Sequence, residues 1–202
     1  MQADRAGRHL VKFSDGTTMR LYRQTVEDFG LYSGRELSEA EMTALRNAAG
    51  QMSAKMRAVR IVAASNVSIS DLEQRLIHKG ESPKQAKEAV QWMTDLNLLD
   101  DTRTAQLLVQ QCVRKGYGKE RAKQLLYEKR IPKSLWESVL EDYPDMTEQI
   151  VVYLRSHLTD ETDPKEVKRA VDALLRRGHS YSQIRHALTC MQVDENEFPE
   201  EF

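Results

Sequence analysis

Basic residues alternate with tyrosines between residues 114 and 130, and no other stretch of the chain has residue types that suggest binding chemistry so strongly. It contains seven lysines and arginines against two glutamates, together with Tyr117 and Tyr127. A second basic stretch covers residues 165–186. Lysine and arginine side chains bind phosphate oxygens, and aromatic rings stack on nucleic-acid bases. The two stretches therefore predict contact with an anionic partner, and the alternative is that they form solvated helix faces.

The sequence carries no recognisable catalytic motif. Its five histidines form no HExxH zinc motif, and there is no GxGxxG, Walker or GxSxG loop. The KGYG at residues 115–118 lacks the strand and the GK[ST] ending of a phosphate loop, so we interpret it as a turn. Asp100 and Asp101 could bind a metal ion, but adjacent carboxylates at a helix start more often cap that helix. Cys112 and Cys190 have no CxxC spacing and are interpreted as reduced core residues. We predict a protein that is not an enzyme and has no cofactor and no metal.

The composition favours small helical units over one thick β core. The chain has 202 residues, of which 40% are apolar and 30% charged, with 9 glycines and 5 prolines. This is a thin core, a charged surface and few turn-forming residues compared with an average globular chain. The formal net charge of −1 argues neither for nor against a nucleic-acid partner. No apolar run approaches the ~18–20 residues that span a bilayer, and no signal peptide is evident, so we expect a cytoplasmic protein without a membrane partner.

The first fifty residues differ from the rest and predict a β-hairpin followed by a helix. The hairpin is expected over roughly residues 9–22, with an Asp-Gly turn at residues 15–16. Ser38 and Glu41 have the spacing of a capping box, which predicts a helix that starts at Ser38. We assign residues 1–53 to this extension.

From about residue 54 the pattern is helical, because apolar residues recur at spacings of three and four. Pairs with the spacing of a helix N-cap and its reciprocal partner mark the helix starts. These pairs are Ser70 with Glu73, Ser82 with Gln85, Asp145 with Glu148, Asp163 with Glu166, and Ser180 with Gln183.

The helical region also repeats internally. Offsets of 50 and 98 residues place Leu76, Leu126 and Leu174 at equivalent positions, each followed three residues later by a basic residue. We predict three tandem three-helix repeats in an elongated, curved array. Their boundaries are 54–99, 100–144 and 145–191, and an acidic tail covers 192–202. Trp136 shares a helix face with apolar residues and is expected to be largely buried.

Residues 98–126, LLDDTRTAQLLVQQCVRKGYGKERAKQLL, resemble the central signature of the bacterial RecX family of regulatory proteins. That signature has a leucine pair, two aspartates, an arginine, and KGYG followed by a basic helix. Residues 58–101 have the form of the family's first repeat, and the N-terminal segment resembles the extension of its longer members. Two departures are Thr104, where the family commonly has tyrosine, and residues 67–69, a turn that is often more basic.

The resemblance implies a non-enzymatic protein that binds the recombinase RecA, mainly as its filament on single-stranded DNA. It also implies inhibition of ATP hydrolysis and strand exchange, and so modulation of recombination and DNA repair. The expected contact residues, in a monomer, are Arg103, Arg114, Lys115, Tyr117, Lys119, Arg121, Lys123, Arg176 and Arg177. Tyr117 can instead pack over its glycine turn, and Asp101 is interpreted as a helix cap. The alternative function is a stand-alone nucleic-acid-binding helical module that needs no recombinase.

Overall fold

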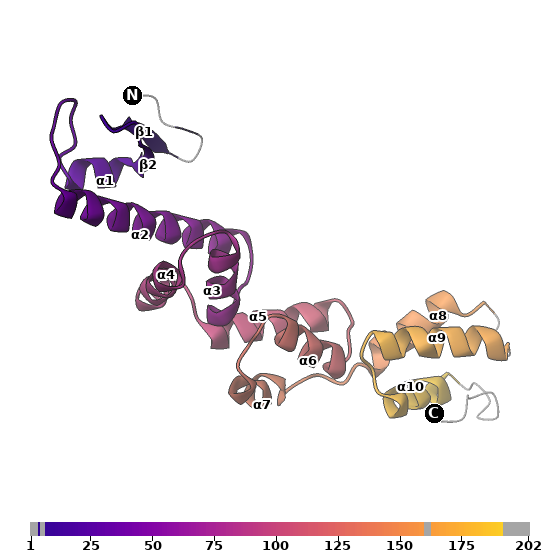
Figure 1. Cartoon of the computed structure of the whole chain (residues 1–202). Helices are drawn as coiled ribbons and strands as arrows, with labels where there is room; N and C mark the ends of the chain where they lie inside the picture. The colour runs from indigo at the N-terminus through magenta and orange to yellow at the C-terminus, as the bar shows by residue number, and fades with distance from the viewer. Residues whose placement is uncertain (1–3, 5–6, 160–162, 192–202) are drawn as a thin grey trace. The chain divides into compact units, whose positions relative to one another are not determined.

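The computed structural model describes residues 4, 7–159 and 163–191, and it is mainly α-helical (Figure 1). The described residues form ten α-helices, one short 3-10 helix and one two-stranded hairpin. This confirms the predicted mostly α fold with an N-terminal hairpin. The chain divides into two compact units, residues 1–100 and 101–202.

The hairpin opens the N-terminal unit. Strands β1 (Arg8–Lys12) and β2 (Thr18–Tyr22) are antiparallel, and Arg8 at the start of β1 pairs with Tyr22 at the end of β2. The predicted Asp-Gly turn is present: Gly16 has φ +84°, and an oxygen of Asp15 accepts a hydrogen bond of 2.8 Å from the backbone N–H two residues further on. Helix α1 (Arg23–Asp28) follows β2 directly. A hairpin of this size needs such support, because two strands alone are marginally stable in water.

Helix α2 (Glu39–Ala64) has 26 residues, and the hairpin and α1 lie against it (Figure 1). It begins at Ser38 with the predicted capping box, in which Ser38 accepts from the backbone of Glu41 and the Glu41 carboxylate accepts from the backbone of Ser38. The helix runs through the boundary expected between residues 53 and 54. Its interior has no proline, and its one glycine, Gly50, keeps the helical conformation, so nothing ends the helix there.

The C-terminal part of α2 packs with α3 (Ile69–His78) and α4 (Pro83–Asp95) as a first helical group. Small alanines on α2 let the helices approach closely around apolar side chains. The most buried members of this core are Ala54, Ala58, Leu72, Leu76, Ala86 and Met93. As predicted, Ser82 caps α4, because its hydroxyl accepts from the backbone N–H of Gln85.

The predicted cap of α3 is wrong by two residues. Ser68, not Ser70, is the N-cap, and its hydroxyl accepts from the backbone N–H of Asp71 at 3.0 Å. Both serines are followed three residues later by an acidic residue, so spacing alone does not separate them. Burial does: Ser68 is fully buried next to the core residue Val67, whereas Ser70 is exposed.

The second helical group begins the C-terminal unit and has a core of its own. It consists of α5 (Asp101–Arg114), α6 (Lys119–Glu128), the 3-10 helix η1 (Lys133–Leu135) and α7 (Trp136–Leu140). Trp136 packs against this core with only part of its surface exposed, in agreement with its expected burial. It starts a helix of only five residues, and its indole N–H donates to the carbonyl of Ile131 at 3.1 Å.

The third helical group closes the described part of the chain around a third core. It consists of α8 (Thr147–His157), α9 (Pro164–Arg176) and α10 (Tyr181–Cys190). Asp163 caps α9, and Ser180 with Gln183 forms the predicted capping box on α10. Asp145 precedes α8 and accepts from the backbone of Thr147. The predicted acidic tail at residues 192–202 lies outside the described residues.

One helix stop recurs in all three groups and confirms the equivalence of the three leucines. Each leucine is buried, and its carbonyl accepts a hydrogen bond from the backbone N–H five residues later. These pairs are Leu76 with Glu81, Leu126 with Ile131, and Leu174 with His179. The residue before each donor has positive φ: +92° at Gly80, +56° at Arg130 and +84° at Gly178. This is the Schellman ending of a helix, in which a left-handed residue lets the chain turn back.

Candidate partner interface

The KGYG sequence ends helix α5 and turns the chain toward α6. Gly116 has φ +64°, and the backbone N–H of Tyr117 donates to the carbonyl of the buried Cys112 at 3.0 Å. A phosphate-binding loop would leave its N–H groups free for a ligand. Here the N–H groups of Gly118 and Glu120 donate instead to backbone carbonyls of the third helical group. The interpretation of KGYG as a turn is confirmed.

The last glycine of this motif makes a very close backbone contact with the third group. The N–H of Gly118 donates to the carbonyl of Arg177 at 2.9 Å, and the N–H of Glu120 donates to the carbonyl of Gly178 at 3.2 Å. A Cβ atom on Gly118 would lie 1.9 Å from the Gly178 oxygen, and one on Gly178 would lie 2.2 Å from the backbone nitrogen of Arg121. Both positions therefore require glycine. We call this contact between the second and third helical groups the joint.

Arg177 holds the joint together on its outer side. Its guanidinium donates to the carbonyl of Lys115 at 2.9 Å and lies 5.2 Å and 5.1 Å from the ring centroids of Tyr117 and Tyr153. A guanidinium between two aromatic faces gains cation–π attraction from both. The hydroxyl of Tyr143 donates to the carbonyl of Tyr117 at 2.7 Å. Burial raises the pKa of Tyr143 to about 12, so this hydroxyl stays a donor. Because its ring contacts Arg177 and its carbonyl binds Tyr143, Tyr117 is half-buried over the glycine turn.

His179 lies on the inner side of the joint and is 3% exposed. Its Nε2 is 3.1 Å from the carbonyl oxygen of Gly116. A carbonyl only accepts, so Nε2 carries the proton, and the buried Nδ1 has no hydrogen-bond partner among the described residues. Burial lowers the pKa of His179, and the positive charge of Arg177 lowers it further. The ring is therefore neutral at pH 7.

Two basic residues of α6 are engaged by carboxylates of the same helix. Arg121 pairs with Glu128 at 3.0 Å, and Lys123 pairs with Glu120 at 2.7 Å. Both cations are half-buried. These pairs lower the charge that α6 presents to a partner, which the sequence alone does not reveal.

Four of the expected contact residues are exposed around the joint. They are Arg114 and Lys115 at the end of α5, Lys119 at the start of α6, and Arg176 at the end of α9. Among the described residues no carboxylate lies within ion-pair distance of any of them. We call these four residues the joint cations. Backbone contacts at the joint place the segments that carry them side by side.

Arg103 is exposed on the first turn of α5 and is separate from the joint. It precedes Arg114 by three helical turns, which places the two arginines on one face, roughly 16 Å apart. The structure thus divides the nine expected residues into exposed cations, cations paired on α6, and the joint residues Tyr117 and Arg177. The structure adds two residues to this site, Gly178 and His179, which sequence reasoning did not single out. The internal repeat could have indicated them, because the offset of 98 residues aligns them with residues 80 and 81 at the end of α3.

The described residues supply no evident catalytic arrangement. No group of three or more His, Cys, Asp or Glu side chains in this part of the chain is placed to hold a metal ion. Both cysteines are free thiols. Burial raises the pKa of the Cys112 thiol, as expected for a core residue. Cys190 is exposed near the end of α10, so its predicted core position is wrong. No helix in the described segments has both the length and the apolar character that crossing a membrane requires.

Comparisons with known proteins agree with this architecture. Residues 100–140 match the family model for the second three-helix domain of RecX. The regulatory protein RecX of Vibrio parahaemolyticus is 30% identical over 71% of this chain and 94% of its own length, and that of Vibrio campbellii is 31% identical over the same shares. A crystal structure of regulatory protein RecX matches 92% of this chain and 96% of its own with a TM-score of 0.65 at 18% identity. RecX from Lactobacillus salivarius matches 73% of this chain and 99% of its own with a TM-score of 0.61 at 19% identity. The chain belongs to the RecX family of regulatory proteins.

Proposed function

We propose that this protein is a non-enzymatic regulator that binds the RecA recombinase, mainly as its filament on single-stranded DNA. Bound there as a monomer, it inhibits ATP hydrolysis and strand exchange and so modulates recombination and DNA repair in the cytoplasm. Family membership carries the proposal. The joint cations support it, because they give the C-terminal unit an exposed basic surface without catalytic groups.

In this proposal seven of the nine expected residues divide into two roles, and Arg121 and Lys123 stay paired with carboxylates of α6. The joint cations and Arg103 contact acidic surface of the recombinase or phosphates of the bound DNA. Arg177 and Tyr117 position them by holding the second and third helical groups in one arrangement. An exposed charge pair contributes only about 0.2–1 kcal/mol. Several such contacts on one fixed surface act together, which gives useful affinity without a deep pocket.

The test replaces all four joint cations by glutamine, as Arg114→Gln, Lys115→Gln, Lys119→Gln and Arg176→Gln. Glutamine keeps the helix propensity nearly unchanged, so folding should survive. A loss of about 0.5 kcal/mol or more at each contact multiplies to roughly thirtyfold weaker binding. The measurement is the half-inhibitory concentration in an ATPase assay of RecA on single-stranded DNA, at two salt concentrations.

A matched control removes the same charge elsewhere. Lys12, Lys87, Lys133 and Lys165 are exposed on β1, α4, η1 and α9. Their replacement by glutamine should leave inhibition within about twofold of the parent protein. Circular dichroism checks the fold of both variants. If the joint variant is folded and inhibits as well as the parent at both salt concentrations, the joint cations are not the contact.

One observation favours the alternative of a stand-alone nucleic-acid-binding module. Tyr127 is 69% exposed on α6, one helical turn beyond Lys123, and its ring is available for base stacking. This alternative predicts that RecA is unnecessary. Tight and steeply salt-dependent binding to naked single-stranded DNA, lost in the variant without joint cations, would favour it over regulation of a filament.

A further inference from the structure

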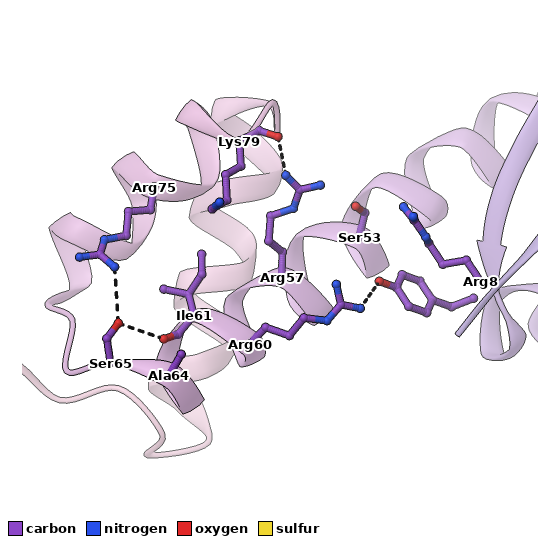
Figure 2. Close-up of a pocket in the computed structure, with 10 residues that line it drawn as sticks. Arg8, Ser53, Arg57, Arg60, Ile61, Ala64, Ser65, Arg75 and Lys79 are labelled. Carbon is purple, nitrogen blue, oxygen red and sulfur yellow. Dashed lines mark hydrogen bonds between the residues drawn. The ribbon is translucent and has the colours of Figure 1, made fainter. Parts of the chain in front are cut away.

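A second cluster of cations lines a recess in the N-terminal unit, between the hairpin, α2 and α3 (Figure 2). The recess has a volume of about 450 Å³, within the roughly 300–1,000 Å³ of sites for small ligands. In the part of the chain that the structure describes, no aspartate or glutamate is among the residues that line it. Its lining residues are Arg8, Tyr22, Ser53, Arg57, Arg60, Ile61, Ala64, Ser65, Arg75 and Lys79. We call it the basic recess.

The sequence builds this cluster from three elements. On α2 the lining residues recur at helical spacing between residues 53 and 64, so they share one face of the helix. Arg75 is on α3 and Lys79 directly follows it as the C-cap, four residues later, so both lie on the same side of this helix end. Arg8 begins β1 directly opposite Tyr22 in the hairpin. These residues are up to 71 positions apart in the sequence, and only the fold brings them together.

Three of the arginines that line the recess form ion pairs with carboxylates. Glu81, whose side chain is 7% exposed, pairs with Arg57 at 3.0 Å, and Asp71, at 13%, pairs with Arg75 at 2.9 Å. The guanidinium side chains are 31% and 36% exposed, so each is more accessible than its partner. Arg8 pairs with Asp4 at 2.8 Å. Glu81 and Asp71 thus fix the forks of Arg57 and Arg75, and both carboxylates are less accessible than the guanidinium groups that they hold.

The remaining contacts also fix the geometry of the recess, as Figure 2 shows. Arg60 donates to the hydroxyl of Tyr22 at 3.0 Å, which joins α2 to the hairpin. Arg57 also donates to the backbone carbonyl of Lys79. Lys79 is exposed at the end of α3. Guanidinium groups held in place before a ligand arrives lose less conformational freedom when it binds.

We infer that the basic recess is a binding site for a backbone phosphate of single-stranded nucleic acid. A backbone phosphate carries its negative charge on two non-bridging oxygens, and each of these can accept from a different guanidinium or ammonium group. Ile61, Ala64 and Tyr22 also line the recess, so apolar surface lies among the cations. A single strand can turn its sugar and base toward such a surface, whereas a duplex keeps its bases stacked inside.

This inference goes beyond the proposed function, because it needs neither RecA nor the C-terminal unit. The test uses the full chain and a fluorescently labelled oligothymidine of twelve nucleotides. The double variant Arg60→Gln, Lys79→Gln leaves the ion pairs of Arg8, Arg57 and Arg75 in place. We expect about tenfold weaker binding. The slope of log affinity against log salt should fall by about 0.7, the value for one phosphate of a single strand.

The matched control is Lys84→Gln, Lys87→Gln, which removes the same charge from the exposed face of α4 in the same unit. It should bind the oligonucleotide nearly as the parent does. Equal losses in the two double variants would overturn the inference, because the attraction would then be general. A loss confined to the variant without joint cations would also overturn it, and would leave the proposed regulation of RecA intact.

Competition separates the possible sources of the anion. Inorganic phosphate and a polyglutamate peptide of matched charge are titrated against the bound oligonucleotide. The inference expects both to compete far more weakly than unlabelled oligothymidine. Equal competition by polyglutamate would make the recess a site for acidic protein, and equal competition by phosphate would make it a site for the free ion.

A second measurement covers the case in which the double variant fails to fold. In the parent protein labelled with nitrogen-15, the Nε–Hε signals of Arg57 and Arg75 report directly on the recess. Oligothymidine should shift these signals more than the signal of the exposed Arg23, which lies outside the recess. Unchanged signals at saturating oligonucleotide would overturn the inference.

Discussion

Lys79 in the first helical group and Arg177 in the third occupy the same place, one residue after the second helix of their group. Lys79 is exposed and lines the basic recess, whereas Arg177 is held between the rings of Tyr117 and Tyr153. The next residue in both groups is a glycine with positive φ. The repeated helix stop therefore places a cation at a fixed position, and the neighbouring segments decide whether it faces a recess or holds a joint.

The residue after this positive-φ residue is buried in all three groups, and its contacts also differ between the groups. Glu81 is held within its own group, because Arg57 and Ser53 of α2 bind its carboxylate. His179 is held by the carbonyl of Gly116, which belongs to the neighbouring group. In the second group this position is Ile131, an ordinary apolar contact of a Schellman ending. The two polar replacements thus connect the helix stop to a second element, inside the group in one case and across the joint in the other.

The largest difference in unfolding free energy between the helix ends at Gly80 and Gly178 is expected when each glycine is replaced by alanine. Gly178→Ala adds a Cβ 2.2 Å from the Arg121 backbone and also strains a residue with φ +84°. Left-handed strain of about 1–2 kcal/mol and overpacking of about 1–3 kcal/mol together predict a loss of about 2–5 kcal/mol. Gly80→Ala has φ +92° but nothing within 4 Å, so only the strain remains. The measurement is the free energy of unfolding in urea.

Tryptophan fluorescence makes this comparison specific to each unit. Trp92 lies in the N-terminal unit and Trp136 in the C-terminal unit. Trp92→Phe leaves a probe for Gly178→Ala, and Trp136→Phe leaves a probe for Gly80→Ala. Equal losses for the two alanines would show that the close approach at the joint does not exist in solution.

Substitution of Arg177 should lower stability without changing oligonucleotide binding, and substitution of Lys79 should do the opposite. Arg177→Gln removes one hydrogen bond and two ring contacts, and we expect a loss of about 1–3 kcal/mol in the unfolding free energy of the C-terminal unit. Lys79→Gln should change stability by no more than about 0.5 kcal/mol, as for most surface substitutions. It should instead weaken oligothymidine binding, which Arg177→Gln should leave unchanged. The reverse pattern would contradict both assigned roles.

Sequence reasoning succeeded where one segment determines its own structure. The hairpin turn at Asp15, the caps at Ser38 and Ser180, and the three equivalent leucines each depend on residues within about five positions. It failed at Ser68 because the competing Ser70 has the same local spacing, and only burial separates the two.

The candidate sites were harder to predict because they are built from distant segments. The KGYG stretch was found as a basic, glycine-rich run, but its contact with Gly178 lies 60 residues away in the sequence. The basic recess was missed entirely. Its cations are scattered over two helices, a helix end and a strand, among acidic residues that balance them in the linear sequence and pair with three of them in the fold.

The smallest effect concerns pH and again separates the two stops. Burial lowers the pKa of His179 from its ordinary value of 6.5 in the folded protein. As the pH falls below about 6.5, the unfolded chain gains a proton that the folded ring does not accept. The stability that the neutral His179 ring contributes to the C-terminal unit is therefore fully present above pH 6.5 and is lost progressively as the pH falls below that value. The decrease from this ring is at most about 1.4 kcal/mol per pH unit, and it ends once the folded protein is protonated too.

His179→Gln tests this directly, because the glutamine amide can still donate to the Gly116 carbonyl but cannot gain a proton. Melting temperatures at pH 7.5 and pH 5.5 are compared for the parent, His179→Gln and His78→Gln. His78 is exposed on α3, outside the C-terminal unit, and its variant is the matched control. The loss between the two pH values should be smaller in His179→Gln than in the other two proteins. If all three proteins lose the same amount, the ring is already protonated or solvated in the folded state. The joint would then be held by Arg177 and the paired glycines without it.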